Sequence, residues 1–257
     1  MKNIFDQPNW VPRLSDNYKI IVTGGTGGLG SALIRLLLEG SKSIIGVHGD
    51  SKKTEFQDSR IIPLKRHFNS EKDCSDVIKE FVDRAKGIDA LVVLNGSIKF
   101  SGHWMNISED QWNTEIRENL SFPFFLARAA MKAMISNKTS GKIVMTGTES
   151  SLHGGSKISM PYAIAKRGTE CMVQGLAKEG APHNILVNGL RLGYFESGFH
   201  QRWHNKTKAE MQERAELVPL KRGGNPIEAA AMVLYLLSGY GDFITGQMVP
   251  LTGGDWL

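Results

Sequence analysis

Short apolar runs alternate with segments of helical periodicity from residue 18 to the end of the chain. Each apolar run has the length of a strand that is buried on both faces of a parallel sheet. The segments between them repeat apolar residues every three or four positions, which predicts amphipathic helices. The predicted strands are 18–23, 43–47, 61–65, 90–95, 142–146, 185–190 and 244–249, and the predicted helices are 31–39, 71–86, 112–135, 160–179 and 226–237. This alternation is typical of a doubly wound α/β fold with about seven parallel strands and helices on both faces.

The pattern predicts one domain, 18–257, because no proline-rich or charged linker interrupts it and no internal repeat is visible. Residues 1–17 precede the first strand as an extension that lies on the domain surface or on a neighbouring subunit. Residues 191–223 carry aromatic and charged side chains between the sixth strand and the last predicted helix. An insertion of this length forms a substrate lid or a peripheral helical hairpin, and the sequence favours neither.

Composition favours a cytoplasmic protein with no membrane or nucleic-acid partner. Of 257 residues, 41% are hydrophobic and 22% charged, and no apolar stretch is long enough for a signal peptide or a membrane span. The net charge of +5 comes from basic residues scattered among acidic ones, without a helix-turn-helix, zinc-binding or RNA-binding motif. Cys74 and Cys171 lack metal-ligand spacing, so we expect no metal site and two reduced, buried thiols.

A glycine-rich segment lies between the first predicted strand and the first predicted helix, and reads Thr23-Gly24-Gly25-Thr26-Gly27-Gly28-Leu29-Gly30. Glycines here let the backbone turn tightly and approach a pyrophosphate, whose charge is stabilised by unpaired amides and the helix dipole. The segment therefore predicts nucleotide binding. It fits three known spacings, so the glycines alone do not select a class of enzyme: Gly25-x-Gly27-x-x-Gly30, Thr23-Gly24-x-x-x-Gly28-x-Gly30 and Thr23-Gly24-x-x-Gly27-x-x-Gly30.

Tyr162 and Lys166 lie four residues apart in the predicted helix 160–179, so their side chains share one helix face. A free phenol titrates near pH 10, and its use as an acid or base at pH 7 requires a pKa about 3 lower. An ammonium about 4 Å away supplies about 4 kcal/mol at an effective dielectric of about 20, which is enough for that change. The pair predicts a general acid/base. The alternative is an accidental spacing on a solvated helix face.

In this order, the glycine turn and the Tyr-x-x-x-Lys pair resemble the short-chain dehydrogenase/reductase family, from about residue 18 to the end. Further similarities are Asn119, the strand opening Lys142-Ile143-Val144, Val187-Asn188 followed by Gly193, and the closing segments Thr245-Gly246-Gln247 and Gly253-Gly254. The resemblance implies a Rossmann fold and an oxidoreductase that transfers hydride between NAD(P) and a carbonyl or secondary alcohol. The closing segment favours the short single-domain branch, and the Tyr-x-x-x-Lys spacing argues against the enoyl reductases.

The resemblance also implies a role for each site residue. Tyr162 is the expected general acid/base, and Lys166 lowers its pKa and binds the nicotinamide ribose. Thr148 orients the substrate carbonyl, and Asn119 holds a water for proton relay. Ser150 competes with Thr148, which counting along the strand favours. The expected cofactor-binding residues are Thr23, Gly24, Thr26, Gly28, Leu29, Gly30, His48, Asp50, Asn95, Lys166 and Gly193.

Departures from the family pattern leave the substrate and the choice of cofactor open. Glu149, beside Thr148, is unusual and could face the substrate or lie exposed in a loop. Asp50 stands slightly late for a contact with the ribose of NAD, whereas Lys52 and Lys53 could reach a 2′-phosphate, which favours NADP slightly over NAD. We expect a small carbonyl or alcohol substrate and a homodimer or homotetramer. The alternative functions are a non-catalytic dinucleotide-binding sensor or scaffold and a nucleotide-sugar epimerase or dehydratase.

Overall fold

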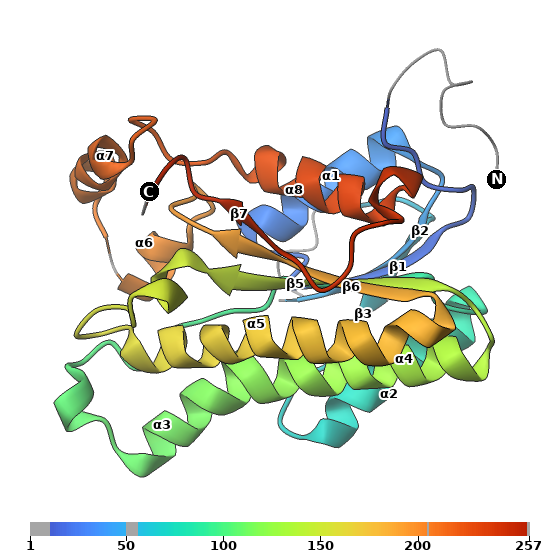
Figure 1. Cartoon of the computed structure of the whole chain (residues 1–257), viewed down its shortest axis with the longest axis horizontal. Coiled ribbons are helices and arrows are strands. Elements are labelled where there is room, and N and C mark those ends of the chain that lie inside the picture. Colours follow the sequence, from blue (N-terminus) through green and yellow to red (C-terminus); the bar gives the residue numbers. More distant parts are fainter. Residues whose placement is uncertain (1–10, 50–55, 205, 256–257) are drawn as a thin grey trace.

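The computed structural model describes residues 11–49, 56–204 and 206–255. Within these residues, seven strands form one parallel sheet in the order β3-β2-β1-β4-β5-β6-β7, which confirms the predicted fold (Figure 1). The strands are β1 Lys19–Thr23, β2 Ile44–His48, β3 Ile61–Leu64, β4 Ala90–Val93, β5 Gly141–Thr148, β6 Ile185–Leu192 and β7 Met248–Leu251. Asp50, Lys52 and Lys53, on which the choice between NAD and NADP depends, lie outside the described residues.

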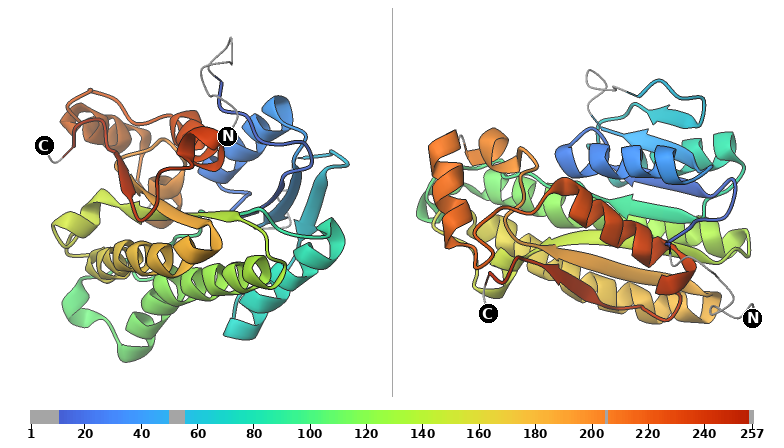
Figure 2. Two further views of the ribbon diagram at one scale, coloured as in Figure 1. Left: turned by 45° about the vertical axis from the view of Figure 1, so that its right-hand side comes forward. Right: turned by 90° about the horizontal axis from the view of Figure 1, so that it is seen from above.

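Helices cover both faces of the sheet (Figures 1 and 2). The helices of one face are α1 (Gly28–Gly40) and α8 (Pro226–Leu237), and those of the other are α2 (Glu71–Ala85), α4 (Phe122–Ser136) and α5 (Met160–Gly180). Shorter elements are α3 (Glu109–Ile116), a π-helical turn η4 (Arg117–Ser121), α6 (Phe199–His204), α7 (Lys208–Leu217) and the single turns η3 (Trp104–Asn106), η5 (Glu149–Leu152), η6 (Ala181–His183) and η7 (Gly239–Gly241).

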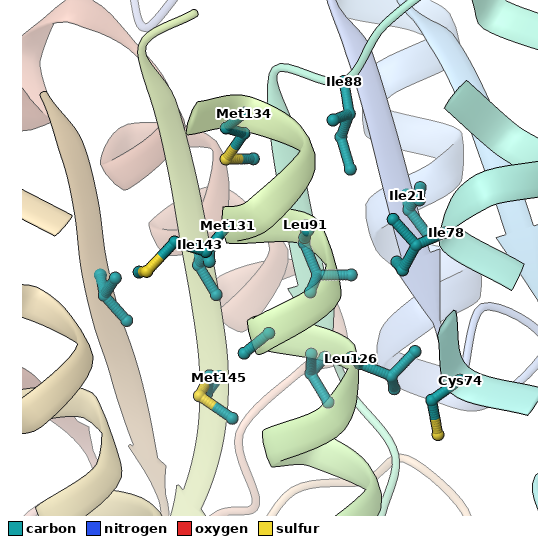
Figure 3. Packing of buried hydrophobic residues seen from close by; sticks show 14 of the residues in the cluster. Ile21, Cys74, Ile78, Ile88, Leu91, Leu126, Met131, Met134, Ile143 and Met145 are labelled. Carbon is teal, nitrogen blue, oxygen red and sulfur yellow. The ribbon is translucent and has the colours of Figure 1, made fainter. Parts of the chain in front are cut away.

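Two apolar layers hold these helices to the sheet. On one face, Ile78 of α2 and Leu126 of α4 belong to the same cluster as the strand residues Leu91 and Ile143 (Figure 3). On the other face, α1 and α8 pack over Val22 of β1. Each fully buried leucine or isoleucine contributes about 1.5–3 kcal/mol relative to exposure. The two layers therefore fix the positions of the strand ends, where the site lies.

The main differences from the predictions concern the last strand, the longest predicted helix and one thiol. The last strand begins at Met248, because Gly246 adopts a φ of +73° and Thr245 accepts a hydrogen bond from Val187 N at 3.1 Å, outside the strand register. The predicted helix 112–135 begins at Glu109 and is interrupted by η4. The expectation of two buried thiols is wrong for Cys171, which is exposed on α5, whereas Cys74 is fully buried.

The two segments outside the regular alternation take different places. In the extension, Leu14 packs at the edge of the core formed by α1 and α8, and Asp16 pairs with Lys42 at 2.9 Å. Residues 191–223 complete β6 and then form α6 and α7, which lie beyond the carboxyl ends of the strands (Figure 1). Within the described ranges, no helix is both long and apolar enough to cross a membrane.

Candidate active site

The strand order reverses between β1 and β4, since the chain moves outward through β2 and β3 before β4 pairs with β1. In doubly wound sheets, ligands bind at the carboxyl ends of the strands beside such a reversal. Two adjoining cavities lie there, one of about 280 Å³ and one of about 640 Å³. We call the first the turn cavity, because the glycine turn lines it, and the second the Tyr162 cavity. Leu94, Asn95 and Gly96, which follow β4, line both.

The glycine turn forms one wall of the turn cavity with its backbone. Gly24 has a φ of +71°, and a Cβ atom there would stand 2.9 Å from the carbonyl carbon of Leu94. A Cβ atom at Gly30 would stand 2.3 Å from the carbonyl oxygen of Gly24. Only glycine fits these positions without displacing backbone.

No described side chain caps the first amides of α1, which leaves them to an anion. Gly27, the N-cap residue of α1, provides no side-chain cap, and the first turn holds no acidic residue. In contrast, α2, α3, α7 and α8 each begin with a complete capping box. Unpaired amides at a helix N-terminus bind phosphate groups. The turn cavity therefore fits the pyrophosphate of a dinucleotide.

Tyr162 and Lys166 lie on the same side of α5 and both line the Tyr162 cavity. A Cβ atom built at Gly96 would stand 3.6 Å from the Tyr162 hydroxyl oxygen and 3.6 Å from Lys166 Nζ. The ammonium is 5.8 Å from the centre of the Tyr162 ring. It donates hydrogen bonds to the carbonyl oxygens of Asn95 at 3.1 Å and Thr146 at 2.9 Å. The lysine is thereby fixed to the carboxyl ends of β4 and β5.

Burial governs the protonation of this pair. It lowers the pKa of Lys166 to about 8, so the ammonium persists at neutral pH. Burial also raises the pKa of Tyr162, and the negative charge of Glu115 raises it further. This direction is opposite to the lowering expected from the Tyr-Lys spacing, because dehydration of the buried phenolate dominates. At neutral pH Tyr162 is therefore a phenol, the form that donates a proton.

Asn119 is fully buried in η4, the π-helical turn between α3 and α4. Its Oδ1 accepts a hydrogen bond from Ser97 N at 3.0 Å, and its Nδ2 donates to Ser97 O at 2.8 Å. Nδ2 also donates to Glu115 Oε2 at 3.0 Å. These contacts fix the segment after β4, which carries the Asn95 carbonyl that Lys166 binds. In the structure the Asn119 amide is engaged by the protein. The predicted water relay through Asn119 stays a prediction.

Glu115, which the sequence did not single out, anchors the same segment. Its side chain is 1% exposed, and Oε1 accepts hydrogen bonds from the backbone amides of Lys99 and Phe100. In the sequence, its position four residues before Asn119 in the predicted helix could have indicated this role. Its charge is also one of the causes that raise the pKa of Tyr162.

Thr148 and Ser150 both line the Tyr162 cavity, so the structure leaves the choice between them open. Thr148 is the last residue of β5, and its hydroxyl oxygen accepts a hydrogen bond from Ser150 N at 3.4 Å. Glu149 lines the same cavity and is buried rather than exposed in a loop, with 6% of its surface accessible.

The structure brings most of the expected cofactor-binding residues together. Those lining the turn cavity are Gly24, Thr26, Gly28, Leu29, Gly30 and Asn95, and those lining the Tyr162 cavity include Leu29, Asn95, Lys166 and Gly193. Thr23 lines neither cavity: it is fully buried, and its hydroxyl donates to Val92 O at 3.4 Å within the sheet. His48 ends β2 with Nε2 2.6 Å from Arg66 O and stacks on Phe68, also outside both linings. Asp50 lies outside the described residues.

Arg202 reaches the turn cavity from α6. A Cβ atom at Gly27 would stand 3.9 Å from its Nη2, and the residue lines the turn cavity together with the glycines. A guanidinium binds phosphate oxygens strongly. The sequence alone does not predict that Arg202 lies near the glycine turn, because its position depends on how residues 191–223 fold back.

A parallel sheet with an anion-binding glycine turn at its switch point, beside a half-buried tyrosine and a buried lysine, defines an enzyme that uses a dinucleotide. A family model described as enoyl-(acyl carrier protein) reductase matches residues 51–255. The chain belongs to the short-chain dehydrogenase/reductase family, whose members are NAD(P)-dependent oxidoreductases, as the sequence motifs predicted.

Two curated proteins and one solved structure illustrate the relationship. The 3-oxoacyl-[acyl-carrier-protein] reductase FabG of Chlamydia muridarum is 30% identical, with 93% of this chain and 97% of that protein covered. The acetoacetyl-CoA reductase of an Acinetobacter species is 28% identical, with 95% and 100% covered. The structure of a short-chain dehydrogenase/reductase (glucose/ribitol dehydrogenase) from Brucella melitensis has a TM-score of 0.82 at 25% identity, with 94% and 98% covered.

The names of the family model and of the two curated proteins divide between two reactions. The family model is described by enoyl reductases, which the Tyr-x-x-x-Lys spacing argues against, whereas these two curated proteins are named for the reduction of keto groups. In this chain the spacing between Tyr162 and Lys166 is four residues.

Proposed function

We propose that this protein reduces a ketone to a secondary alcohol in the Tyr162 cavity, with NADPH as the hydride donor. The observation that carries the proposal is the juxtaposition of the Tyr162 hydroxyl and the Lys166 ammonium beside Gly96, where the Tyr162 cavity meets the turn cavity. The keto groups named in the two curated relatives support the type of reaction.

Each residue of the site has its own role in this reaction. When bound, a reduced nicotinamide supplies the hydride. Tyr162 donates its phenolic proton to the oxygen that becomes the alcohol. Lys166 donates two N–H groups to the carbonyls of Asn95 and Thr146, which would leave the third for a ribose hydroxyl of the cofactor. The hydroxyl of Thr148, or of Ser150, donates a hydrogen bond to the substrate carbonyl oxygen. Together these groups hold the carbonyl and donate the proton to its oxygen.

The turn cavity would hold the remaining part of the cofactor. The amides at the start of α1, which no described side chain caps, and the guanidinium of Arg202 would bind the pyrophosphate. NADPH is favoured over NADH because β2 ends at His48, so that Asp50 stands slightly late in the sequence for the ribose hydroxyls of NAD, whereas Lys52 and Lys53 could reach a 2′-phosphate. Burial lowers the pKa of His48, so it is neutral at pH 7 and does not repel or attract the 2′-phosphate by charge.

The test is a panel of ketones assayed with both nicotinamides, together with dissociation constants for NADPH and NADH. We expect tighter binding of NADPH and its oxidation by at least one ketone. Binding without oxidation across the panel would favour the sensor or scaffold. Turnover of a nucleotide sugar without net cofactor consumption would favour the epimerase. Absence of binding to both nicotinamides would overturn the proposal.

We also propose that the protein acts as a homodimer or homotetramer, as is common among relatives of this family. Light scattering coupled to gel filtration would test this proposal, and a monomer at assay concentration would contradict it.

A further inference from the structure

Glu149 is a buried carboxylate inside the Tyr162 cavity whose hydrogen-bonding capacity is largely unused. Its Oε1 is 3.5 Å from Ser150 Oγ, at the outer limit of a hydrogen bond. Its Oε2 is buried and accepts no hydrogen bond from the described residues, although His153 Nε2 lies 3.7 Å away. A carboxylate offers about four acceptor sites, and buried polar groups are normally satisfied. The missing donors are therefore a feature to be explained.

Two other buried glutamates show what a structural carboxylate looks like in this chain. Glu170 is 7% exposed, and its oxygens accept hydrogen bonds from Ser151, Arg167 and Arg191 at 2.8–3.0 Å. Glu115 accepts from two backbone amides and from the Asn119 amide. Both are saturated by the protein. Glu149 is equally buried but lacks such partners among the residues described, and it alone of the three lines the Tyr162 cavity.

Among the described residues, the charges near Glu149 are His153, at 3.7 Å, and an arginine that is engaged elsewhere. Arg214 of α7 acts electrostatically on Glu149, but its guanidinium is paired with Asp255 and lies over the Tyr194 ring. Burial raises the pKa of Glu149, and Asp255 raises it further, whereas His153 and Arg214 lower it. Within the described part of the chain, Glu149 Oε1 has only the 3.5 Å contact with Ser150, so a donor supplied by a ligand in the cavity would satisfy this oxygen, and an anionic ligand group would be repelled by the carboxylate.

We infer that Glu149 is a substrate-specificity residue, and that the substrate is a ketone carrying a hydrogen-bond donor, a hydroxyl group or a protonated amine, close to its carbonyl carbon. The inference rests on the proposed function, because it takes Tyr162 as the place where the carbonyl is reduced. The donor belongs near the carbonyl because Glu149 directly follows Thr148, a candidate carbonyl ligand at the end of β5. Simple apolar ketones and free 3-oxo acids are disfavoured substrates.

Three ketones of matched shape test this specificity: hydroxyacetone, aminoacetone and butanone, which differ only in the group two bonds from the carbonyl carbon. Their homologues with one more methylene allow for a longer reach. We expect the wild-type enzyme to favour a donor-bearing ketone over its apolar match by at least about tenfold in kcat/KM. Glu149→Gln keeps an acceptor but loses the charge, so it should lose the preference for an amine more than for a hydroxyl. Glu149→Leu should lose both.

Glu213→Gln is the matched control, because Glu213 is an exposed carboxylate that lines the same cavity from α7. It should retain the wild-type preference. Thermal unfolding gives an independent readout: Glu149→Gln should leave Tm unchanged or raised, whereas Glu170→Gln, which loses a saturated ion pair, should lower it.

The outcomes separate this inference from the proposed function. If the wild-type protein reduces apolar ketones as well as their donor-bearing matches, or if Glu149→Gln lowers Tm as much as Glu170→Gln, the specificity role of Glu149 is overturned while the reductase remains. If the wild-type protein reduces no ketone of either series, nor any in the wider panel, the proposed function fails and the specificity role falls with it.

Discussion

The ammonium of Lys166 and the carbonyl oxygen of Asn95 are joined by a hydrogen bond of 3.1 Å that connects α5 to the segment after β4. A second bond of 2.9 Å reaches Thr146 O in β5. With 2% of its surface exposed, this cation is stabilised by carbonyl dipoles in place of water. The same lysine therefore serves the site and ties a helix to two strand ends.

The burial of Lys166 predicts a pH dependence of stability. Its pKa is lowered from 10.5 to about 8, so between these values the native state binds fewer protons than the unfolded chain. The free energy of unfolding then rises with pH across that interval. The rise is at most about 3 kcal/mol, since each pKa unit corresponds to about 1.4 kcal/mol.

Lys166→Met should lack this contribution. We expect the difference in unfolding free energy, wild type minus variant, to grow in favour of the wild type from pH 8 to 10.5, as measured by urea denaturation. Subtraction removes the contributions of other groups that titrate in this range, such as Cys74. Lys178→Met, at an exposed position of the same helix, should give a constant difference. A constant difference for Lys166→Met as well would show that the ammonium is not desolvated.

Tyr162→Phe should reduce turnover of an accepted ketone by at least about a hundredfold, because the alkoxide loses its positioned proton donor. The dissociation constant for NADPH should change by less than about twofold, since the hydroxyl is not expected to bind the cofactor. Tyr194→Phe makes the same chemical change at another tyrosine of the same cavity and should retain most of the activity. Comparable turnover in Tyr162→Phe and the wild type would remove this tyrosine from the mechanism.

Thr148→Ala and Ser150→Ala decide which hydroxyl binds the substrate carbonyl. We expect Thr148→Ala to lower kcat by at least about tenfold and Thr148→Ser to restore it, because serine retains the donor. Ser150→Ala should stay within about threefold of the wild type. The reverse order would assign the role to Ser150.

The strands and the Tyr162–Lys166 pair could be predicted because they depend on local patterns. Apolar runs of strand length report burial on both faces, and a spacing of four residues reports a shared helix face whatever the rest of the chain does. The limits of β7 were missed because the φ of +73° at Gly246 is set by contacts with β6, not by its neighbours in sequence.

The remaining features of the site depend on contacts between distant segments. The direction of the pKa change at Tyr162 follows from burial and from Glu115, which a helix spacing does not report. Asn119 binds Ser97, 22 residues away, a contact that the sequence motif does not report. Thr23 belongs to the sequence motif of the turn, but its side chain points into the sheet toward Val92. Motifs thus identify which segments meet, and packing decides which side chains face the ligand.

Asn119→Ala should destabilise the protein and also impair catalysis. The substitution leaves the Ser97 amide and carbonyl without the partners seen in the structure, and each buried unsatisfied group costs about 1–3 kcal/mol. We expect the free energy of unfolding to fall by about 2–4 kcal/mol and kcat to fall with it, because the segment that holds Lys166 loosens. Asn113→Ala, at an exposed position in α3, serves as the control. Unchanged stability of Asn119→Ala would leave the water relay as its principal role.

Arg202→Ala should weaken the binding of both nicotinamide cofactors. Its guanidinium stands over the glycine turn, 3.9 Å from a Cβ atom built at Gly27, where a pyrophosphate would bring two negative charges. Loss of a charge-assisted hydrogen bond to phosphate predicts about a tenfold or larger increase in the dissociation constant. Gln201→Ala, the exposed neighbour in α6, should leave it unchanged.

Two measurements distinguish a pyrophosphate contact from a general loss of affinity: the dissociation constants of NADPH and NADH, and their dependence on salt concentration. If Arg202 binds the pyrophosphate, Arg202→Ala should raise the dissociation constants of NADPH and NADH by the same factor, because both share this group. The salt dependence of binding should also decrease in the variant, since one ionic contact is gone. A loss confined to NADPH would instead assign Arg202 to the 2′-phosphate, and equal affinities in variant and wild type would show that α6 does not close on the cofactor.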